Sequence, residues 1–440
     1  MNYFEIYATI LLIKARRYFV EQKRIAENGI PVYSFTNKNN HGFFVSMFLK
    51  AGCMYESECE NGITHFLEHV SIRNVNKLMD GRLYRELERL GMEFNASTYS
   101  EMVQFYISGA DKNFRSAAEM ISRLLSPIVL DRVEIDAERN RVKAEIREVD
   151  DKSTLAFIAG ESVWRNTPLA RAITGTLGSV SGISAKKLED YRKRIFNSEN
   201  IFFYVTGNVD DDSIDYLCEL VGGYSVAGCD IHDNVAIVPD EFGKRRKTIG
   251  HKNADFTKIR YSFDVDMSRV SCAELDLLYD TVLGGYSSDF FIELSEKRGL
   301  FYDLGGSVER YRNVGVFSFS YELKESKLIE AVRMTSELLR SYTENTVEPE
   351  RSMRACYVDN ADMLLDEPRE LCFTFAYDNH VLGLGYGSIE DRKRAYASIT
   401  PQRLRDVAKE VFRPENLTVT LKANKKKINL SELENIIFGE

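Results

Sequence analysis

Residues Ile183–Asn208, ISAKKLEDYRKRIFNSENIFFYVTGN, have a counterpart in the second half of the chain, ITPQRLRDVAKEVFRPENLTVTLKAN at Ile399–Asn424. Aligned without a gap at an offset of 216 positions, the two stretches are identical at eight of 26 positions. Any two helix-to-strand joints share caps and amphipathic spacing, so part of this likeness needs no common origin. The offset is nearly half of the 440 residues, however, and this favours an internal duplication.

Each copy predicts a capped helix followed by a buried strand. Ser184 and Thr400 are suitable N-cap residues. Apolar residues then recur at helical spacing, at Leu188, Tyr191 and Ile195 in one copy and at Leu404, Val407 and Val411 in the other. Upstream, the pattern predicts strands at 43–50, 92–99 and 103–108 and helices at 63–70, 80–90, 114–125 and 131–151. Because helices and strands mix without strict alternation, we expect an α+β fold with antiparallel sheets.

Composition indicates a folded chain with more than one core. The 440 residues are 44% hydrophobic and 28% charged, which is too long for one ordinary core and too apolar for a disordered chain. We expect a first half at 1–227, a linker at 228–244 and a second half at 245–440. The net charge of −9 argues against a nucleic-acid partner.

The sequence pattern predicts neither a membrane span nor a secretory signal peptide. No apolar run approaches the roughly 20 residues needed to span a bilayer, so no membrane association is expected. The short run Ile6–Ile13 precedes its positive charges, which reverses the order of a signal peptide. The stretch up to Phe19 could be a docked helix or an interaction arm. Seven scattered cysteines without a CxxC pair predict reduced thiols and a cytoplasmic location.

The candidate chemistry lies in an HxxEH sequence, HFLEH at 65–69. On a helix, His65 and His69 leave the same face one turn apart, which is a chelating geometry for zinc. Glu68 projects from the adjoining flank, where it could reach a water without being a ligand. A histidine pair on a helix is more often part of a core or a cap, and the embedded glutamate is what favours a metal site here.

A third zinc ligand must come from elsewhere in the chain, because catalytic zinc ordinarily has three protein ligands and one open position. The long predicted helix 131–151 offers four glutamates, of which Glu138 and Glu145 lie two turns apart on one face. Either could be the ligand. The alternative for such a charged helix is a solvated stripe with salt bridges to Arg141 and Lys143.

HFLEH, followed 76 positions after His69 by the last glutamate of an E-x6-E pair, resembles the inverzincin zinc metallopeptidases typified by pitrilysin, insulin-degrading enzyme and mitochondrial processing peptidase. Other segments extend this resemblance over most of the chain, namely Asn95-Ala96 with Tyr106, Thr167-Pro168-Leu169 with Gly175-Thr176, Val205–Asn208, and Gly284–Ser288 through Lys297–Tyr302. The resemblance implies two homologous α/β-roll halves that form a clam-like chamber, with one Zn2+ per chain in the first half.

Carried over residue by residue, the resemblance implies that His65, His69 and Glu145 ligate zinc. Glu68 would be the general base that takes a proton from the attacking water, and Glu138 would orient a ligand from behind. A peptide would add as a strand near Asn95 and Ala96, with Tyr302 also binding substrate.

One departure concerns partner chains. Many members place an arginine seven positions before the tyrosine, but this chain has Ser295 there, and Arg298 stands one helical turn further on. A serine cannot replace a guanidinium clamp. We therefore expect a homodimer, or a heterodimer with a paralogous chain that supplies the missing arginine. No histidine occurs at 273–285, where the second half would place its counterpart of the zinc helix.

These features predict a zinc-dependent endopeptidase that cuts short or unfolded peptides, with precursor or leader peptides as a natural class. One alternative is a non-catalytic or partner-dependent binding or assembly subunit of a two-chain peptidase, which Ser295 favours. Another is a zinc hydrolase with a nonpeptidic substrate, which would share the same ligands.

Overall fold

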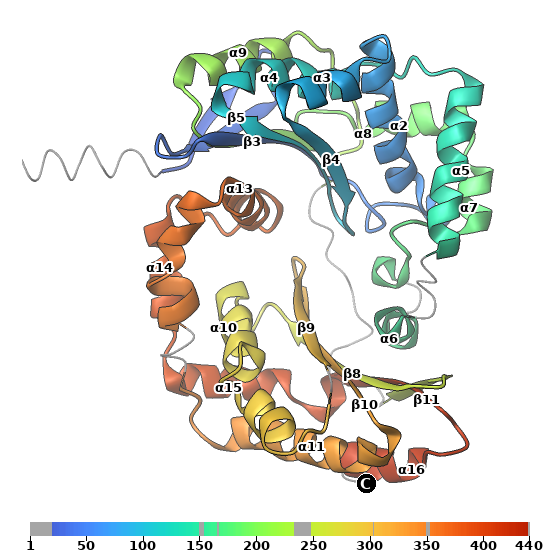
Figure 1. Cartoon of the computed structure of the whole chain (residues 1–440), viewed down its shortest axis with the longest axis vertical. Helices are drawn as coiled ribbons and strands as arrows, with labels where there is room; N and C mark the ends of the chain where they lie inside the picture. Colours follow the sequence, from blue (N-terminus) through green and yellow to red (C-terminus); the bar gives the residue numbers. More distant parts are fainter. Residues whose placement is uncertain are drawn as a thin grey trace, which may run out of the picture. The chain divides into compact units, whose positions relative to one another are not determined.

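The computed structural model describes residues 20–148, 154–164, 167–232, 248–301, 303–348 and 353–438. Its contacts divide the chain into two compact units, whose elements are labelled in Figure 1. Unit 1 comprises residues 1–149, 171–235 and 362–391, and unit 2 comprises 150–170, 236–361 and 392–440. Each unit therefore includes a segment from the other half of the sequence.

Unit 1 is built on a six-stranded sheet with the strand order β1-β2-β6-β3-β5-β4. The strands are β1 (Gln22–Ile25), β2 (Pro31–Thr36), β3 (Gly42–Leu49), β4 (Glu93–Thr98), β5 (Val103–Ala110) and β6 (Ile201–Gly207). Neighbouring strands are antiparallel except β2 and β6, which run parallel. β4 is an edge strand because it pairs only with β5.

Helices cover both faces of this sheet. The helices of unit 1 are α2 (Ile63–Leu78), α3 (Leu83–Leu90), α4 (Phe114–Ser122), α5 (Arg132–Glu148), α7 (Leu177–Gly182), α8 (Ala185–Ile195), α9 (Asp211–Gly222) and α13 (Pro368–Ala376). Side chains of α2, α4, α8 and α9 share one apolar core with the sheet. α13 contacts β3 and β6, and its Phe375 packs against Phe35 of β2 with ring centroids 5.0 Å apart.

Unit 2 repeats this plan on a five-stranded sheet with the order β7-β11-β8-β10-β9. The strands are β7 (Thr248–Asn253), β8 (Thr257–Asp266), β9 (Asp303–Arg310), β10 (Val314–Leu323) and β11 (Leu417–Ala423), and the helices include α6 (Leu155–Val163), α10 (Cys272–Leu283), α11 (Leu328–Glu344), α15 (Pro401–Val411) and α16 (Leu430–Phe438). Here β7 and β11 are the parallel pair. α6, from the first half of the sequence, contacts β7, β8 and β11.

The helix-plus-strand repeat is present in both units, as α8 with β6 and α15 with β11. Ser184 accepts a hydrogen bond from Lys187 N, and Thr400 accepts one from Arg403 N, both at 3.1 Å. Both predicted caps are thus formed. The predicted α+β class with two homologous halves is confirmed. Each sheet nevertheless contains one parallel pair that the sequence did not indicate, because its two strands lie far apart in the chain.

The predicted linker at 228–244 falls largely outside the described residues, and the boundaries 1–227 and 245–440 stay a prediction. Of its first residues, Gly228 N donates to Phe196 O at 2.9 Å, so the chain continues along unit 1 at this point. The stretch up to Phe19 also lies outside the described residues. In the described part of the chain, no helix has the length and apolarity needed to cross a membrane.

Candidate metal centre

Helix α2 begins in a backbone geometry that glycine adopts easily. Its N-cap residue Gly62 has φ +89°, and a Cβ there would lie 2.7 Å from a backbone oxygen of the loop before α7. Gly62 has no side chain to cap the helix, and the buried Glu56 carboxylate takes that role. It accepts hydrogen bonds from Gly62 N at 2.8 Å, Thr64 N at 2.9 Å and Asn61 Nδ2 at 3.1 Å. A carboxylate therefore holds the first turn of α2, which carries His65.

Three of the predicted residues meet at one point. His65 and His69 have ring centroids 4.8 Å apart. Glu145 on α5 places Oε2 at 3.6 Å from Nε2 of His65 and 3.4 Å from Nε2 of His69. Donor atoms around a tetrahedral zinc ion, each about 2.0–2.1 Å from the metal, lie about 3.3–3.4 Å apart. The two Glu145 distances are close to this spacing, and the donor atoms of all three side chains lie within 4.8 Å of one another, so the group could hold a zinc ion.

Within the described residues, this is the one group of three histidine, cysteine or acidic side chains with metal-binding spacing. Helix α10, at the expected counterpart position in unit 2, carries Asp276 instead. Its carboxylate is 2.9 Å from Arg310 and accepts a hydrogen bond from the Tyr396 hydroxyl at 2.8 Å. The Asp276 carboxylate is thus bound by the side chains of Arg310 and Tyr396.

Glu138 lies behind the group and touches one of the histidines. Its side chain is 2% exposed, and its Oε2 is 3.7 Å from Nδ1 of His69. Arg73 donates to Glu138 at 2.7 Å and Arg141 at 3.1 Å. Burial alone would raise the pKa of Glu138, but these partners lower it, so the carboxylate stays ionised and can orient the His69 ring.

The pKa values of the two histidines shift in opposite directions. Burial, reinforced by the neighbouring His69, lowers the pKa of His65 to about 4. Burial would also lower the pKa of His69, but the hydrogen bond to Glu138 and the charges of Glu145 and Glu68 raise it. The buried Nδ1 of His65 has no hydrogen-bond partner among the described residues. His65 is therefore neutral and ready to act as a ligand, and the capped turn of α2 holds its backbone in place.

Glu68 lies beside the group and contacts the edge strand. Its Oε2 accepts a hydrogen bond from Thr98 Oγ1 on β4 at 2.5 Å. Burial raises the pKa of Glu68, and the hydrogen bond from Thr98 partly offsets that shift. A buried carboxylate with a raised pKa is suited to accept and return a proton near neutral pH.

The structure describes two of the three predicted substrate-binding residues. Asn95 and Ala96 lie on the edge strand β4, where Ala96 N donates to Asn95 Oδ1 at 2.8 Å. Tyr302 lies outside the described residues. Ser295 lies in unit 2, in the helical turn Phe291–Glu296. Arg298, the arginine one helical turn after Ser295, is paired with Glu293 at 2.9 Å.

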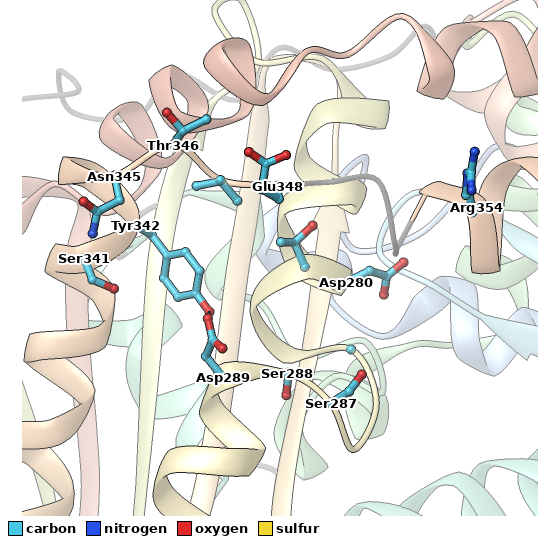
Figure 2. Close-up of a pocket in the computed structure, with 13 residues that line it drawn as sticks. Asp280, Ser287, Ser288, Asp289, Ser341, Tyr342, Asn345, Thr346, Glu348 and Arg354 are labelled. Atoms are coloured by element: carbon cyan, nitrogen blue, oxygen red, sulfur yellow. Dashed lines mark hydrogen bonds between the residues drawn. The ribbon is translucent and has the colours of Figure 1, made fainter.

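Unit 2 also contains a polar cavity of about 680 Å³ next to α10. Figure 2 shows the Tyr342 side chain directed at Asp289, to which it donates a hydrogen bond at 2.9 Å. All of the lining residues belong to unit 2, and the His65–His69–Glu145 group belongs to unit 1. None of the three residues of that group therefore lines the cavity.

Two family models match the chain in succession. The model described as insulinase, peptidase family M16, matches residues 32–177, and the model for the peptidase M16 inactive domain matches residues 182–355. The chain belongs to peptidase family M16. The metal centre lies within the first matched region, and α10 with its ion-paired aspartate lies within the second.

Relatives in this family carry protease names. An uncharacterized zinc protease of Rickettsia felis is 24% identical over 370 residues, which span 82% of this chain and 86% of that relative. The beta subunit of the rat mitochondrial-processing peptidase is 30% identical over 185 residues, which span 42% of this chain and 38% of that subunit. The chain is thus similar to zinc proteases.

Solved structures share the fold. A protease from Helicobacter pylori matches with a TM-score of 0.79 at 19% identity, over 92% of this chain and 100% of that chain. A peptidase M16 inactive domain from Pseudomonas fluorescens also matches with a TM-score of 0.79, at 14% identity, over 92% of this chain and 98% of that chain. At these identities the matches establish the two-unit architecture.

Three residues that support the site were missed from the sequence, namely Glu56, Thr98 and Arg73, which donates to Glu138 at 2.7 Å. Glu56 caps α2 from an irregular loop, and no helical or strand period links it to the HxxEH sequence. Thr98 reaches Glu68 because β4 passes beside α2, which is a tertiary contact. A glycine directly before a predicted helix could have indicated that the cap must come from another residue.

Proposed function

We propose that this chain is a zinc-dependent endopeptidase that cuts short or unfolded peptides, with precursor or leader peptides as the favoured class. The observation that carries the proposal is the convergence of His65, His69 and Glu145 at zinc-ligand spacing, with Glu68 beside them. Family membership and the zinc-protease names of relatives support it.

The donor set fits zinc in chemistry as well as in spacing. Two imidazoles and one carboxylate form a three-ligand set that leaves a fourth position for water or substrate. The Glu145 side chain is 44% exposed, so that position can be reached from solvent. Zinc bound there, one ion per chain, would supply Lewis acidity that activates a water and polarises a peptide carbonyl.

The protein's own groups provide the proton transfers and the alignment. Glu68 takes a proton from the attacking water and then gives it to the amine that leaves. Thr98 holds the Glu68 carboxylate in place through its hydroxyl. Because Thr98 also belongs to the edge strand β4, a peptide paired with that edge brings its backbone next to Glu68.

We also propose that full activity needs a second chain, either another copy or a paralogue. Ser295 at the position of the family arginine supports this, and the beta-subunit name of the mitochondrial relatives is in keeping with it. None of the seven cysteines, all of which the structure describes, is in a disulfide, which supports a reducing compartment such as the cytoplasm.

The decisive experiment compares wild type with Glu68→Gln. Zinc content is measured by elemental analysis, and products from a peptide library are identified by mass spectrometry, with and without a candidate partner chain. Glu58→Gln is the matched control, because Glu58 is an exposed acid in the short 3-10 helix (Glu58–Glu60) before α2. We expect about one zinc in all three proteins and loss of cleavage only in Glu68→Gln. Zinc binding without any cleavage by wild type, alone or with its partner, would instead indicate a binding or assembly subunit.

A further inference from the structure

The edge strand β4 has an alternating set of backbone groups that do not bond to β5. Tyr99 N donates to Met102 O at 2.8 Å, where the β4–β5 hairpin closes. In an antiparallel ladder every second residue exchanges hydrogen bonds with its partner strand, so Ser97, Asn95 and Glu93 are bonded to β5. The residues between them, Phe94, Ala96 and Thr98, direct their backbone groups toward the open edge.

One contact agrees with this alternation. Ala96 N donates to the side chain of Asn95 at 2.8 Å and not to β5. A peptide strand added at this edge would replace that side-chain acceptor with a backbone carbonyl. Its own side chains would alternate between the α2 face and the α13 face of the sheet.

Helix α13 brings an arginine to the second of these faces. Arg369 donates through Nη2 to Glu93 at 3.0 Å and to the Tyr106 hydroxyl at 3.1 Å. Its guanidinium carbon lies 4.7 Å from the centroid of the Tyr106 ring, and its side chain is 50% exposed. Tyr106 is the partner of Asn95 across the β4–β5 ladder. The guanidinium is thus fixed next to the edge strand and stays open to solvent.

At the contact between Arg369 and Glu93, it is Arg369 that still has unused hydrogen-bond donors. Both carboxylate oxygens of Glu93 already accept a hydrogen bond, one from Tyr106 at 3.1 Å and one from Arg369. Two of the five N–H donors of Arg369 are used, and Nε and Nη1 have no described partner. A guanidinium with free N–H groups binds carboxylates in preference to other groups.

We propose that Arg369 selects peptides that carry a carboxylate on the α13 face, either an acidic side chain or the peptide's C-terminus. This rests on the proposed peptidase function. Along β4, Asn95 and Glu93 lie three and five residues from Thr98, or about 10 and 17 Å at the rise of a strand. Because Thr98 contacts Glu68, the selected carboxylate lies three to five residues from the bond that is cut.

The inference can be tested through binding, without any cleavage. Fluorescent peptides are prepared from one neutral sequence. In each peptide a single position is replaced by Glu, and a matched peptide has Gln at the same position. A separate pair carries a free or an amidated C-terminus. Fluorescence anisotropy with the Glu68→Gln protein then gives the affinity for each peptide. The Glu series and the C-terminal pair distinguish the two sources of the carboxylate.

We expect about fivefold tighter binding of the carboxylate-bearing peptide than of its neutral match, and loss of this ratio in Arg369→Gln. Glu93→Gln should increase the ratio, because it removes the carboxylate that competes for Arg369. A purely structural role for Arg369 would not move the ratio in opposite directions in the two variants. Arg24→Gln is the matched control. Arg24 is also ion-paired, to Asp211, but it lies on β1 at the opposite edge of the sheet.

Equal affinities for charged and neutral peptides, or an unchanged ratio in Arg369→Gln, would overturn the inference. Either result would leave the proposed function intact, because cleavage by wild type is measured separately. Conversely, a carboxylate preference in a protein that cuts no peptide would support the role of Arg369 and contradict the peptidase function.

Discussion

Replacing Glu56 by glutamine is expected to loosen the start of the helix that carries His65. The Glu56 side chain is buried, and its two oxygens accept three N–H groups, two of them from the backbone of the N-cap residue Gly62 and of Thr64 in the first turn of α2. Glutamine keeps one acceptor oxygen and turns an NH2 group toward a donor. At least one backbone N–H then has no partner, while the fold of the surrounding loop can persist.

The expected cost is about 2–4 kcal/mol. An unsatisfied buried N–H costs about 1–3 kcal/mol, and the lost attraction between a carboxylate and a helix N-terminus adds up to about 2 kcal/mol. Burial raises the pKa of Glu56, which shows that its charge is itself penalised and offsets part of the loss. At about 1.4 kcal/mol per factor of ten, opening of the first turn should become about 30- to 1,000-fold more frequent.

The assay is amide hydrogen exchange followed by mass spectrometry on peptides that cover residues 60–70. This readout is local, whereas unfolding of a chain with two compact units need not be two-state. Faster exchange in Glu56→Gln should be accompanied by weaker zinc binding, because His65 loses its fixed backbone. Glu58→Gln serves as the control. Equal exchange in the two variants would show that the Glu56 cap does not hold α2.

Three further results are expected at the metal centre. Thr98→Val removes a hydrogen bond that lowers the pKa of Glu68, so the acid limb of the pH profile of kcat/KM should move to higher pH; an unmoved limb would contradict Glu68 as the base. Glu138→Gln should weaken zinc binding about 10- to 100-fold in chelator competition, because His69 loses its orienting partner, and unchanged affinity would refute that role. Between roughly pH 5 and 6, zinc affinity should fall about tenfold per pH unit, since His69 is protonated there and His65, with a pKa of about 4, is not; a hundredfold fall would contradict this difference.

The sequence could predict that His65 and His69 lie together, because their relation is local. His65 and His69 are one helical turn apart, and the periodicity of α5 left Glu138 and Glu145 as the candidates for the third position. Choosing Glu145 required the family resemblance, since both glutamates share one face of the helix. The structure places Glu145 nearest to both Nε2 atoms and Glu138 behind His69.

The features that were missed depend on contacts between distant segments. The parallel pairs β2–β6 and β7–β11 join strands that lie far apart in the chain, and no periodicity within a strand records its partner. The position of α13 on the sheet of unit 1 has the same cause. The sequence pattern therefore does not indicate Arg369, although this residue lies beside the edge strand that includes Asn95.

The placement of α6 and α13 suggests how such a chain could arise. Phe35 and Phe48, on strands of unit 1, lie on the face that α13 and the residues after it cover. Thr420 of β11 in unit 2 donates to Leu155 O of α6 at 3.0 Å. If the gene were divided between its halves, each product would lack the helix that shields one side of its sheet, and the fragments should be insoluble apart and recover when co-expressed. In a domain-swapped homodimer, each protomer packs one of its helices on the sheet of the other protomer. Fusion of two such protomers into one chain would give the exchanged positions of α6 and α13.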